Sequence, residues 1–250
     1  MKKAFIKTGI GFIIVFSSFV AYSQDAKPII SSARFMAGIT GGISVPSGNF
    51  TSTDYGNDKA GFAGSGYNLG MTGTWFIERN FGITALLSYH QYSYHGINSM
   101  AAGFQDAFDV DSASASQKGT NHSINILVGP YYSIPLSSKF SVDLRLLGGI
   151  TNNTLAGYDV VLTDAGITHP PLTQNTAMAN SFAMQGGVAL RYNVGQHWAL
   201  MLNGDYFYSK PDFTIVNVDR NANAGREITS YNQPIAGVNT NLTLVYLLKH

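Results

Sequence analysis

The chain contains no cysteine, which excludes disulfides, thiolate metal sites and cysteine nucleophiles. Charge is also scarce, because only 12% of the 250 residues are charged, against about 25% in an average soluble domain. The formal net charge of +1 is too close to zero for a nucleic-acid-binding protein. Apolar residues make up 45% of the chain, which also has 27 glycines and 14 tyrosines. This composition favours a β-sheet protein surrounded by an apolar solvent.

The N-terminus has the pattern of a secretory signal peptide. Three lysines precede an apolar run at positions 10–20, and the small residues Ala21 and Ser23 stand at the −3 and −1 positions of a cut before Gln24. The run is shorter than the ~20 residues of a stable transmembrane helix, so cleavage is favoured over an uncleaved anchor. We expect residues 1–23 to be removed on export across the inner membrane, and residues 24–250 to form one domain.

Long apolar runs are missing from the rest of the chain, and alternation with a period of two takes their place. In "QGGVALRYNV" (185–194), Val188, Leu190 and Tyr192 share one face, whereas Ala189 and Arg191 share the other. The same pattern recurs in eight segments, which we interpret as strands. They are 33–46, 65–78, 80–94, 121–135, 139–152, 179–194, 197–210 and 235–248.

The connections between these segments alternate between short and long. The short ones are "ERN", "PLSSK" and "VGQHW", and the other four are much longer than an ordinary hairpin loop. This asymmetry is typical of outer-membrane barrels, and a soluble sandwich has little reason to show it. The sequence therefore predicts an all-β fold: an eight-stranded antiparallel up-and-down transmembrane β-barrel in the outer membrane, with short periplasmic turns, long extracellular loops and both termini on the short-turn side.

Aromatic residues gather at both ends of the predicted strands. Those at the short-turn ends are Trp75, Phe81, Tyr132, Phe140, Tyr192 and Trp198, and those at the loop ends are Tyr89, Tyr92, Tyr94, Tyr206 and Tyr208. Two aromatic girdles around an aliphatic band match the two interfaces of a bilayer. A general preference of aromatic residues for strands explains their presence but not their two clusters.

If the apolar faces point to lipid, the charged side chains of the strands lie in the lumen. Counting from the turns places Glu78, Asp143, Arg145 and Arg191 near the periplasmic end, with Asp205 nearer mid-height. Buried charges of opposite sign are expected to pair. We interpret these five residues as a structural ion-pair network that fills the narrow interior, and a gated ion or proton path is the alternative.

The sequence resembles the small outer-membrane β-barrel proteins of the OmpA/OmpX-like class. The resemblance covers nearly the whole mature chain and is carried by "GITGGISVPSGNF" (38–50), the repeated outward aliphatic pattern and "GVNTNLTLVYLLKH" (237–250). It implies outer-membrane lipid as the surroundings, and the barrel-assembly machinery and periplasmic chaperones as partners during biogenesis. The class has no shared catalytic residues, and its members include structural anchors, adhesins, small-solute pores and lipid-modifying enzymes.

One pair of residues fits an enzyme. Ser93 and His95 share a face near the outer rim and are candidates for the nucleophile and base of a lipid-modifying hydrolase, although no third orienting acid is evident. Asp109 and Asp111 in "FDVDSAS" lack the remaining ligands of a calcium loop, so we interpret this stretch as a solvated loop. His122, His169 and His197 have no ligand spacing. We predict no metal and no cofactor.

The long loops favour a non-enzymatic protein with a structural or surface-binding role toward an unknown extracellular ligand. "PDFTIVNVDRN" (211–221) alternates well enough to continue the seventh strand above the membrane and offer a sheet edge to another strand. A small-solute or ion pore is an alternative, as is the hydrolase. A soluble barrel with an apolar ligand is disfavoured, because its exterior would be unusually poor in lysine and glutamate.

Overall fold

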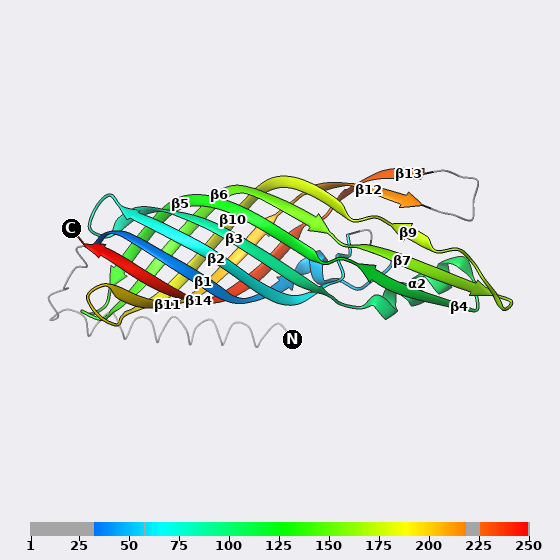
Figure 1. Cartoon of the computed structure of the whole chain (residues 1–250), viewed down its shortest axis with the longest axis horizontal. Helices are drawn as coiled ribbons and strands as arrows, with labels where there is room; N and C mark the ends of the chain where they lie inside the picture. Colours follow the sequence, from blue (N-terminus) through cyan, green and yellow to red (C-terminus); the bar gives the residue numbers. More distant parts are fainter. Residues whose placement is uncertain (1–32, 58, 219–225, 250) are drawn as a thin grey trace, which may run out of the picture.

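The structure, a computed structural model, describes residues 33–57, 59–218 and 226–249. Eight antiparallel strands close into a barrel in the order β1-β14-β11-β10-β6-β5-β3-β2 (Figure 1). The strands are β1 (Ala33–Ser47), β2 (Ala63–Phe76), β3 (Phe81–Tyr94), β5 (Asn121–Pro135), β6 (Phe140–Leu155), β10 (Ala177–Asn193), β11 (Trp198–Ser209) and β14 (Ile235–Lys249). Each predicted strand corresponds to one of these, with ends that agree within three residues. The predicted signal peptide, residues 1–23, lies outside the described residues.

The first and last strands of the barrel join its two edges. β1 pairs with β14 from Ala33↔Lys249 to Ser47↔Ala236, and with β2 on its other side. The short turns lie at the same end as Ala33 and Lys249, and the turn before β11 contacts β14 there, where Leu247 N donates to the His197 carbonyl over 2.7 Å. No barrel strand is left with a free ladder edge, which is what a hydrocarbon environment requires.

The barrel is apolar outside and largely polar inside. In β11, exposed and buried residues alternate along the whole strand: Leu200 and Leu202 are exposed, whereas Asn203 and Asp205 are buried. β5 shows the same inversion, since Ile126 is exposed and Asn125 is fully buried. A soluble protein buries its aliphatic side chains, so the exposed aliphatic band is a surface for lipid.

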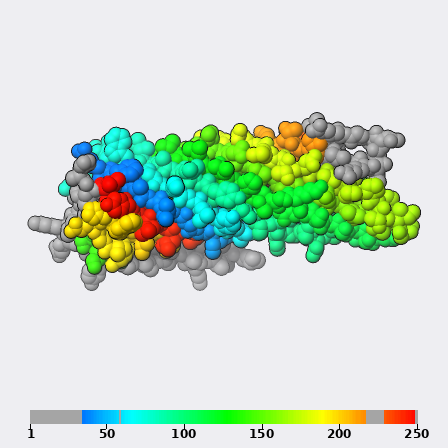
Figure 2. All heavy atoms as spheres, in the orientation of Figure 1, coloured from blue at the N-terminus to red at the C-terminus, as the bar shows by residue number. Residues whose placement is uncertain are grey.

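Above the barrel, the long connections build a second layer, which we name the platform. It contains η1 (Gly48–Thr51), α2 (Ile97–Phe108), β4 (Ser112–Lys118), β7 (Gly157–Asp164), β8 (Ile167–Thr168), β9 (Leu172–Gln174), β12 (Asp212–Val218) and β13 (Arg226–Asn232). Its strands form a sheet in the order β13-β12-β9-β7-β4, with β8 paired to β7. The platform extends the molecule along the barrel axis (Figures 1 and 2). Among the described residues, no helix is both long enough and apolar enough to cross a membrane.

Two sequence interpretations of the loops are wrong. The stretch 211–221 contains β12, but β12 belongs to the platform sheet, where it pairs with β13 along its whole length and with β9 at its last two residues, so it does not continue the barrel ladder. β11 ends at Ser209 and β12 begins at Asp212. Pro211 lies between them and has no N–H for a ladder hydrogen bond, so the strand is interrupted there. In "FDVDSAS" (108–114), interpreted as a solvated loop, Asp109 and Asp111 are exposed and precede the strand, but residues 112–114 belong to β4, which pairs with β7.

The lipid-facing orientation of β11 predicts a depth-dependent effect of charge. Leu202 lies midway between the exposed rings of Trp198 and Tyr206, so Leu202→Arg is expected to destabilise the folded barrel by about 2–4 kcal/mol. The matched control is Val194→Arg, because Val194 is exposed beside the short turn and a charge near the interface costs about 0–1 kcal/mol. Urea unfolding in phosphatidylcholine vesicles measures both. Equal stabilities of the two variants would contradict a bilayer centred on Leu202.

Candidate functional site

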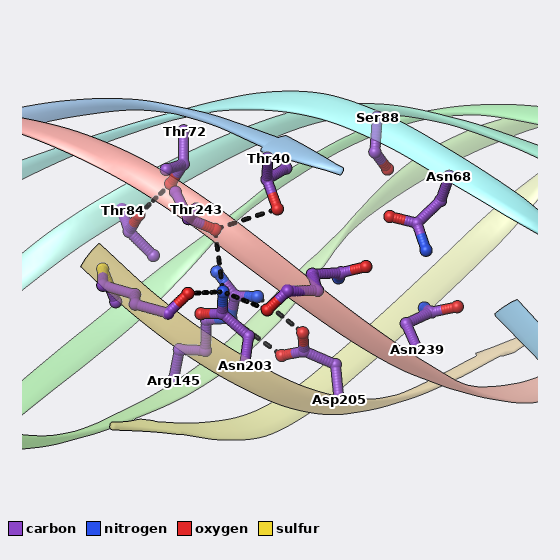
Figure 3. Close-up of polar contacts among 12 residues, drawn as sticks. Thr40, Asn68, Thr72, Thr84, Ser88, Arg145, Asn203, Asp205, Asn239 and Thr243 are labelled. Carbon is purple, nitrogen blue, oxygen red and sulfur yellow. Dashed lines mark hydrogen bonds and ion pairs between the residues drawn. The ribbon is translucent and has the colours of Figure 1, made fainter. Parts of the chain in front are cut away.

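The lumen is crossed by an ion pair between β6 and β11. Arg145 Nε donates to Asp205 Oδ1 over 2.8 Å, and its Nη2 donates to Oδ2 over 2.6 Å (Figure 3). β10 lies between the two strands, and its Gly187 is opposite both residues. A Cβ atom at Gly187 would collide with the Asp205 carboxylate. The glycine therefore leaves the space in which a bidentate pair spans three neighbouring strands.

A second buried pair lies nearer the short turns. Arg191 Nε is 3.2 Å from Asp143 Oδ2, but its hydrogen bonds go to two serine hydroxyls and to the sulfur of Met36, to which Nη1 donates over 2.9 Å. Nε donates to Ser141 Oγ over 2.9 Å, and Nη2 donates to Ser133 Oγ over 2.8 Å. The Arg191 side chain is 4% exposed and that of Asp143 is 1% exposed, so each charge offsets the other inside the barrel.

The structure thus brings together four of the five residues that we expected in the lumen, as two separate pairs. Glu78 is not among them: it is exposed in the turn between β2 and β3, and no described residue forms an ion pair with it. The predicted strand 65–78 extends two residues beyond the end of β2. β2 ends at Phe76, so Glu78 has left the ladder and its carboxylate stays in water.

Uncharged polar side chains continue the network through the middle of the barrel (Figure 3). Asn203 Nδ2 donates to Thr243 Oγ1 over 2.7 Å, and Thr243 donates to Thr40 over 2.9 Å. Thr72 and Thr84 share a further hydrogen bond of 3.2 Å. These hydroxyl and amide groups satisfy one another in place of water, whereas Asn203 Oδ1 and Asn241 Oδ1 have no hydrogen-bond partner among the described residues.

Apolar layers cover this polar belt at both ends. The layer at the short-turn end consists of Met36, Tyr131, Ala189, Ala199, Met201, Val245 and Leu247, with Phe76 packed against it. The layer at the loop end includes Phe50, Tyr92, Phe207, Phe213 and Ile215. Phe50 comes from η1 and Phe213 from β12, so the platform itself contributes side chains to the seal. The interior is a filled core, as expected for eight strands.

The predicted girdle residues lie on the outer surface, with two exceptions, Tyr92 and Tyr94. Tyr94 lines a pocket in the platform and stacks on Phe62, with the ring centroids 5.9 Å apart. Trp75 is 62% exposed and Trp198 49% at the short-turn end. The other exposed or half-buried rings are Phe81, Tyr132, Phe140, Tyr192, Tyr89, Tyr206 and Tyr208. Tyr92 is 2% exposed and packs its ring on Phe50, because it shares the inward parity of His90 in β3. Rings at both ends of the aliphatic band match the two interfaces of a bilayer.

The chain is an eight-stranded outer-membrane β-barrel. No protein-family model matches the sequence, and a search of curated proteins found no match. Among solved structures it is similar to a major outer membrane protein of Thermus thermophilus, with 14% identity, coverage of 86% of this chain and 99% of that one, and a TM-score of 0.49.

Two further solved structures are similar at lower scores. OprG of Pseudomonas aeruginosa has 11% identity, coverage of 86% of this chain and 98% of that one, and a TM-score of 0.43. Outer Membrane Protein W of E. coli has 15% identity, coverage of 86% and 98%, and a TM-score of 0.35. The closure of the barrel, its apolar exterior and its largely polar interior define the fold.

Ser93 and His95 do not form a nucleophile and base pair. The Ser93 hydroxyl donates to the Ser65 carbonyl over 2.6 Å, so its proton is directed at the backbone. Both residues are exposed, and no hydrogen bond joins their side chains. A serine nucleophile needs its base within hydrogen-bonding distance, which this arrangement does not provide.

The platform is the remaining candidate site, and contacts among the loops hold it together. Asp111 accepts a hydrogen bond of 2.8 Å from Ala165 N, which joins the start of β4 to the β7–β8 turn. Lys118 Nζ lies 2.7 Å from Asp159, across the β4–β7 pair. Gln233 Nε2 donates to the Lys59 carbonyl over 3.1 Å. All four long connections therefore belong to one layer.

Sequence reasoning missed most of the platform, although one signal was present. α2 places Met100, Phe104 and Phe108 at intervals of four residues, which is the spacing of one helical face. β4 gave no comparable signal, because "SASASQK" contains no large apolar residue to alternate with its serines.

The Arg145–Asp205 pair predicts an asymmetric response to substitution. Asp205→Asn leaves a buried guanidinium without its counter-charge and is expected to destabilise the barrel by about 3–5 kcal/mol. The double variant Arg145→Met, Asp205→Leu removes both charges and is expected to recover most of that loss. Urea unfolding in vesicles compares the three proteins. A double variant as unstable as Asp205→Asn would show that the pair does more than neutralise two buried charges.

The two apolar layers predict that the barrel does not conduct. The refolded protein in a planar bilayer is expected to give no steady single-channel current, because an ion would have to pass both the apolar layers and the polar belt between them. A variant with Phe50, Phe207 and Phe213 changed to alanine tests the outer layer. Stable current steps from the unaltered protein would contradict the filled core.

Proposed function

We propose that this protein is a non-enzymatic surface-binding protein of the outer membrane whose platform takes up an extended peptide segment as an added strand beside β4. The observation that supports this is the position of β4 at the end of the platform sheet. It pairs with β7 along Ser112↔Thr163 to Lys118↔Gly157. No described strand lies on its other side, and α2 is the other element that packs against it. An edge of this kind presents ladder groups for pairing with another chain.

The composition of β4 supports the same proposal. Proteins usually protect an exposed edge with lysine, proline or a bulge, and the stretch from Ser112 to Ser116 has none of these. The lysine at the end of the strand, Lys118, is held by Asp159 of β7. Ser112, Ser114 and Ser116 are exposed, and their small side chains leave room for a partner backbone.

The alternatives receive less support from the geometry. The apolar layers of the lumen argue against a pore, and the hydrogen bond of Ser93 to the backbone argues against a hydrolase. The barrel-assembly machinery and periplasmic chaperones remain part of the proposal as partners during biogenesis, since a barrel of this kind must be inserted into the outer membrane.

Proline substitution in β4 tests strand addition. Successive residues of a strand direct their N–H groups to opposite edges, so one of Ser114→Pro and Ala115→Pro removes a donor toward β7 and the other removes a donor from the free edge. The free-edge variant is expected to keep its fold and to lose binding at least tenfold. The probe is a phage-displayed library of random twelve-residue peptides, panned against the protein in lipid nanodiscs.

The control variants are Ser114→Ala and Ala115→Ser, which exchange the side chains and keep both N–H groups. They are expected to bind the enriched peptides as the unaltered protein does. Folding of each variant is checked by the difference in gel mobility between unheated and heated samples. Peptides that bind all folded variants equally, or no enrichment over empty nanodiscs, would overturn the proposal.

A further inference from the structure

A pocket of about 270 Å³ lies within the platform where the four long connections meet. Aromatic side chains from each of the four line it, among them Tyr55, Phe62, Phe104, Tyr158 and Tyr231. Pockets lined mainly by aromatic and apolar groups with a few polar atoms are the usual form of small-molecule sites. No residue of β4 lines the pocket, so it is a candidate binding site separate from the β4 edge.

The aromatic walls are fixed by contacts among themselves. The Tyr55 ring meets the Phe104 ring edge-on with centroids 5.1 Å apart, and Phe104 meets Tyr158 at 6.2 Å. Tyr55 can lie this close to α2 because residue 103 is glycine, where a Cβ atom would collide with the Tyr55 ring. The walls are thus already in place without a ligand, which reduces the entropy lost on binding.

The lining carries no charged side chain. Burial raises the pKa of Tyr158 to about 12 and also raises the pKa of Tyr55, so both phenols stay neutral at physiological pH. A charged ligand would lose its hydration here without meeting a counter-charge, which is unfavourable. The polar side chains of the lining are tyrosines, Thr229 and Gln174. The hydroxyls of Tyr94 and Tyr231 already donate within the protein, so an uncharged polar group of a ligand would meet mainly Tyr55, Tyr158 and the Gln174 amide.

The floor of the pocket closes it off from the barrel. Leu155 and Ile215 line the pocket and also belong to the apolar layer at the loop end of the lumen. A molecule that enters from outside therefore meets a packed layer and is held at the platform. This geometry suits a binding site and gives no route onward into the lumen.

We propose that this pocket binds a small, uncharged aromatic ring compound with one hydrogen-bonding edge. At the packing density of protein interiors, its volume accommodates roughly ten non-hydrogen atoms. The flat rings of the walls provide offset-stacked and edge-on contacts to the ligand ring, and the amide and hydroxyl groups bind its polar edge. The inference does not depend on strand addition at β4.

The test compares two probes of equal size that differ in charge, benzamide and benzoate. Ligand-observed saturation-transfer NMR is measured with the full mature chain in phosphatidylcholine nanodiscs, and empty nanodiscs give the background. Benzamide is expected to bind saturably and at least tenfold more tightly than benzoate. Methyl glucoside, an uncharged ring without aromatic character, is expected to bind at least tenfold more weakly than benzamide.

Two tryptophan substitutions locate the binding. Ala60 lines the pocket, so Ala60→Trp is expected to fill it and weaken benzamide binding at least tenfold. Ala107 is exposed on α2 and is not part of the lining, so Ala107→Trp is expected to leave the affinity within twofold. If Ala60→Trp fails to fold by gel mobility, Gly103→Ala replaces it, because the added methyl displaces Tyr55.

Three results would overturn the inference: no saturable binding of benzamide to the folded protein, equal binding of benzoate, or unchanged binding in the pocket variant. If methyl glucoside binds as tightly as benzamide or more tightly, the proposed class of ligand, an aromatic ring compound, is wrong and a sugar ring fits the pocket better. The free-edge proline variant of β4 separates the two proposals, because it is expected to lose peptide binding and to keep benzamide binding.

Discussion

Backbone groups inside a bilayer have no water to bind, so every N–H and C=O of a membrane-crossing sheet must find a partner in the protein. The pairing of β1 with β14 over the full length of both strands meets this demand, and the remaining features of the barrel follow from it. Closure fixes one face of each strand toward lipid and the other toward the lumen. The alternation of Leu202 with Asn203 in β11 is a consequence of that division.

Closure with eight strands leaves a narrow interior that side chains must fill. Buried charges in this interior lie beside charges of opposite sign, because an uncompensated charge would be costly. Arg145 and Asp205 meet across Gly187, and Arg191 lies beside Asp143 with two serine hydroxyls as acceptors. Apolar layers lie on both sides of the Arg145–Asp205 pair, whereas Arg191 lines a small pocket at the short-turn end. The same interior that stabilises the barrel leaves no continuous path for an ion.

The barrel could be predicted from the sequence because its determinants are local. The period of two is visible within a single strand, and the alternation of short and long connections is visible along the chain without knowledge of which strands pair. The ion pairs of the lumen were harder to predict from the sequence. The pairing of Arg145 with Asp205 depends on the register of three strands and on the absence of a side chain at Gly187. Glu78 was misplaced because the end of β2 cannot be read from alternation alone. Tyr92 was assigned to a girdle by its position along β3, although its parity placed it inside.

The platform escaped prediction for a different physical reason. Outside the membrane, water and the platform's own side chains share the surfaces of each strand, so no uniform apolar face marks them. β4 is an example, since its serines and alanines acquire a strand conformation from pairing with β7 rather than from their own preferences. The barrel sequence is constrained by lipid on one side and a filled lumen on the other, whereas the platform has no lipid-facing side and meets the lumen only through residues such as Phe50 and Phe213. The outer edge of β4 and the uncharged aromatic pocket are two features of the platform that the membrane did not require.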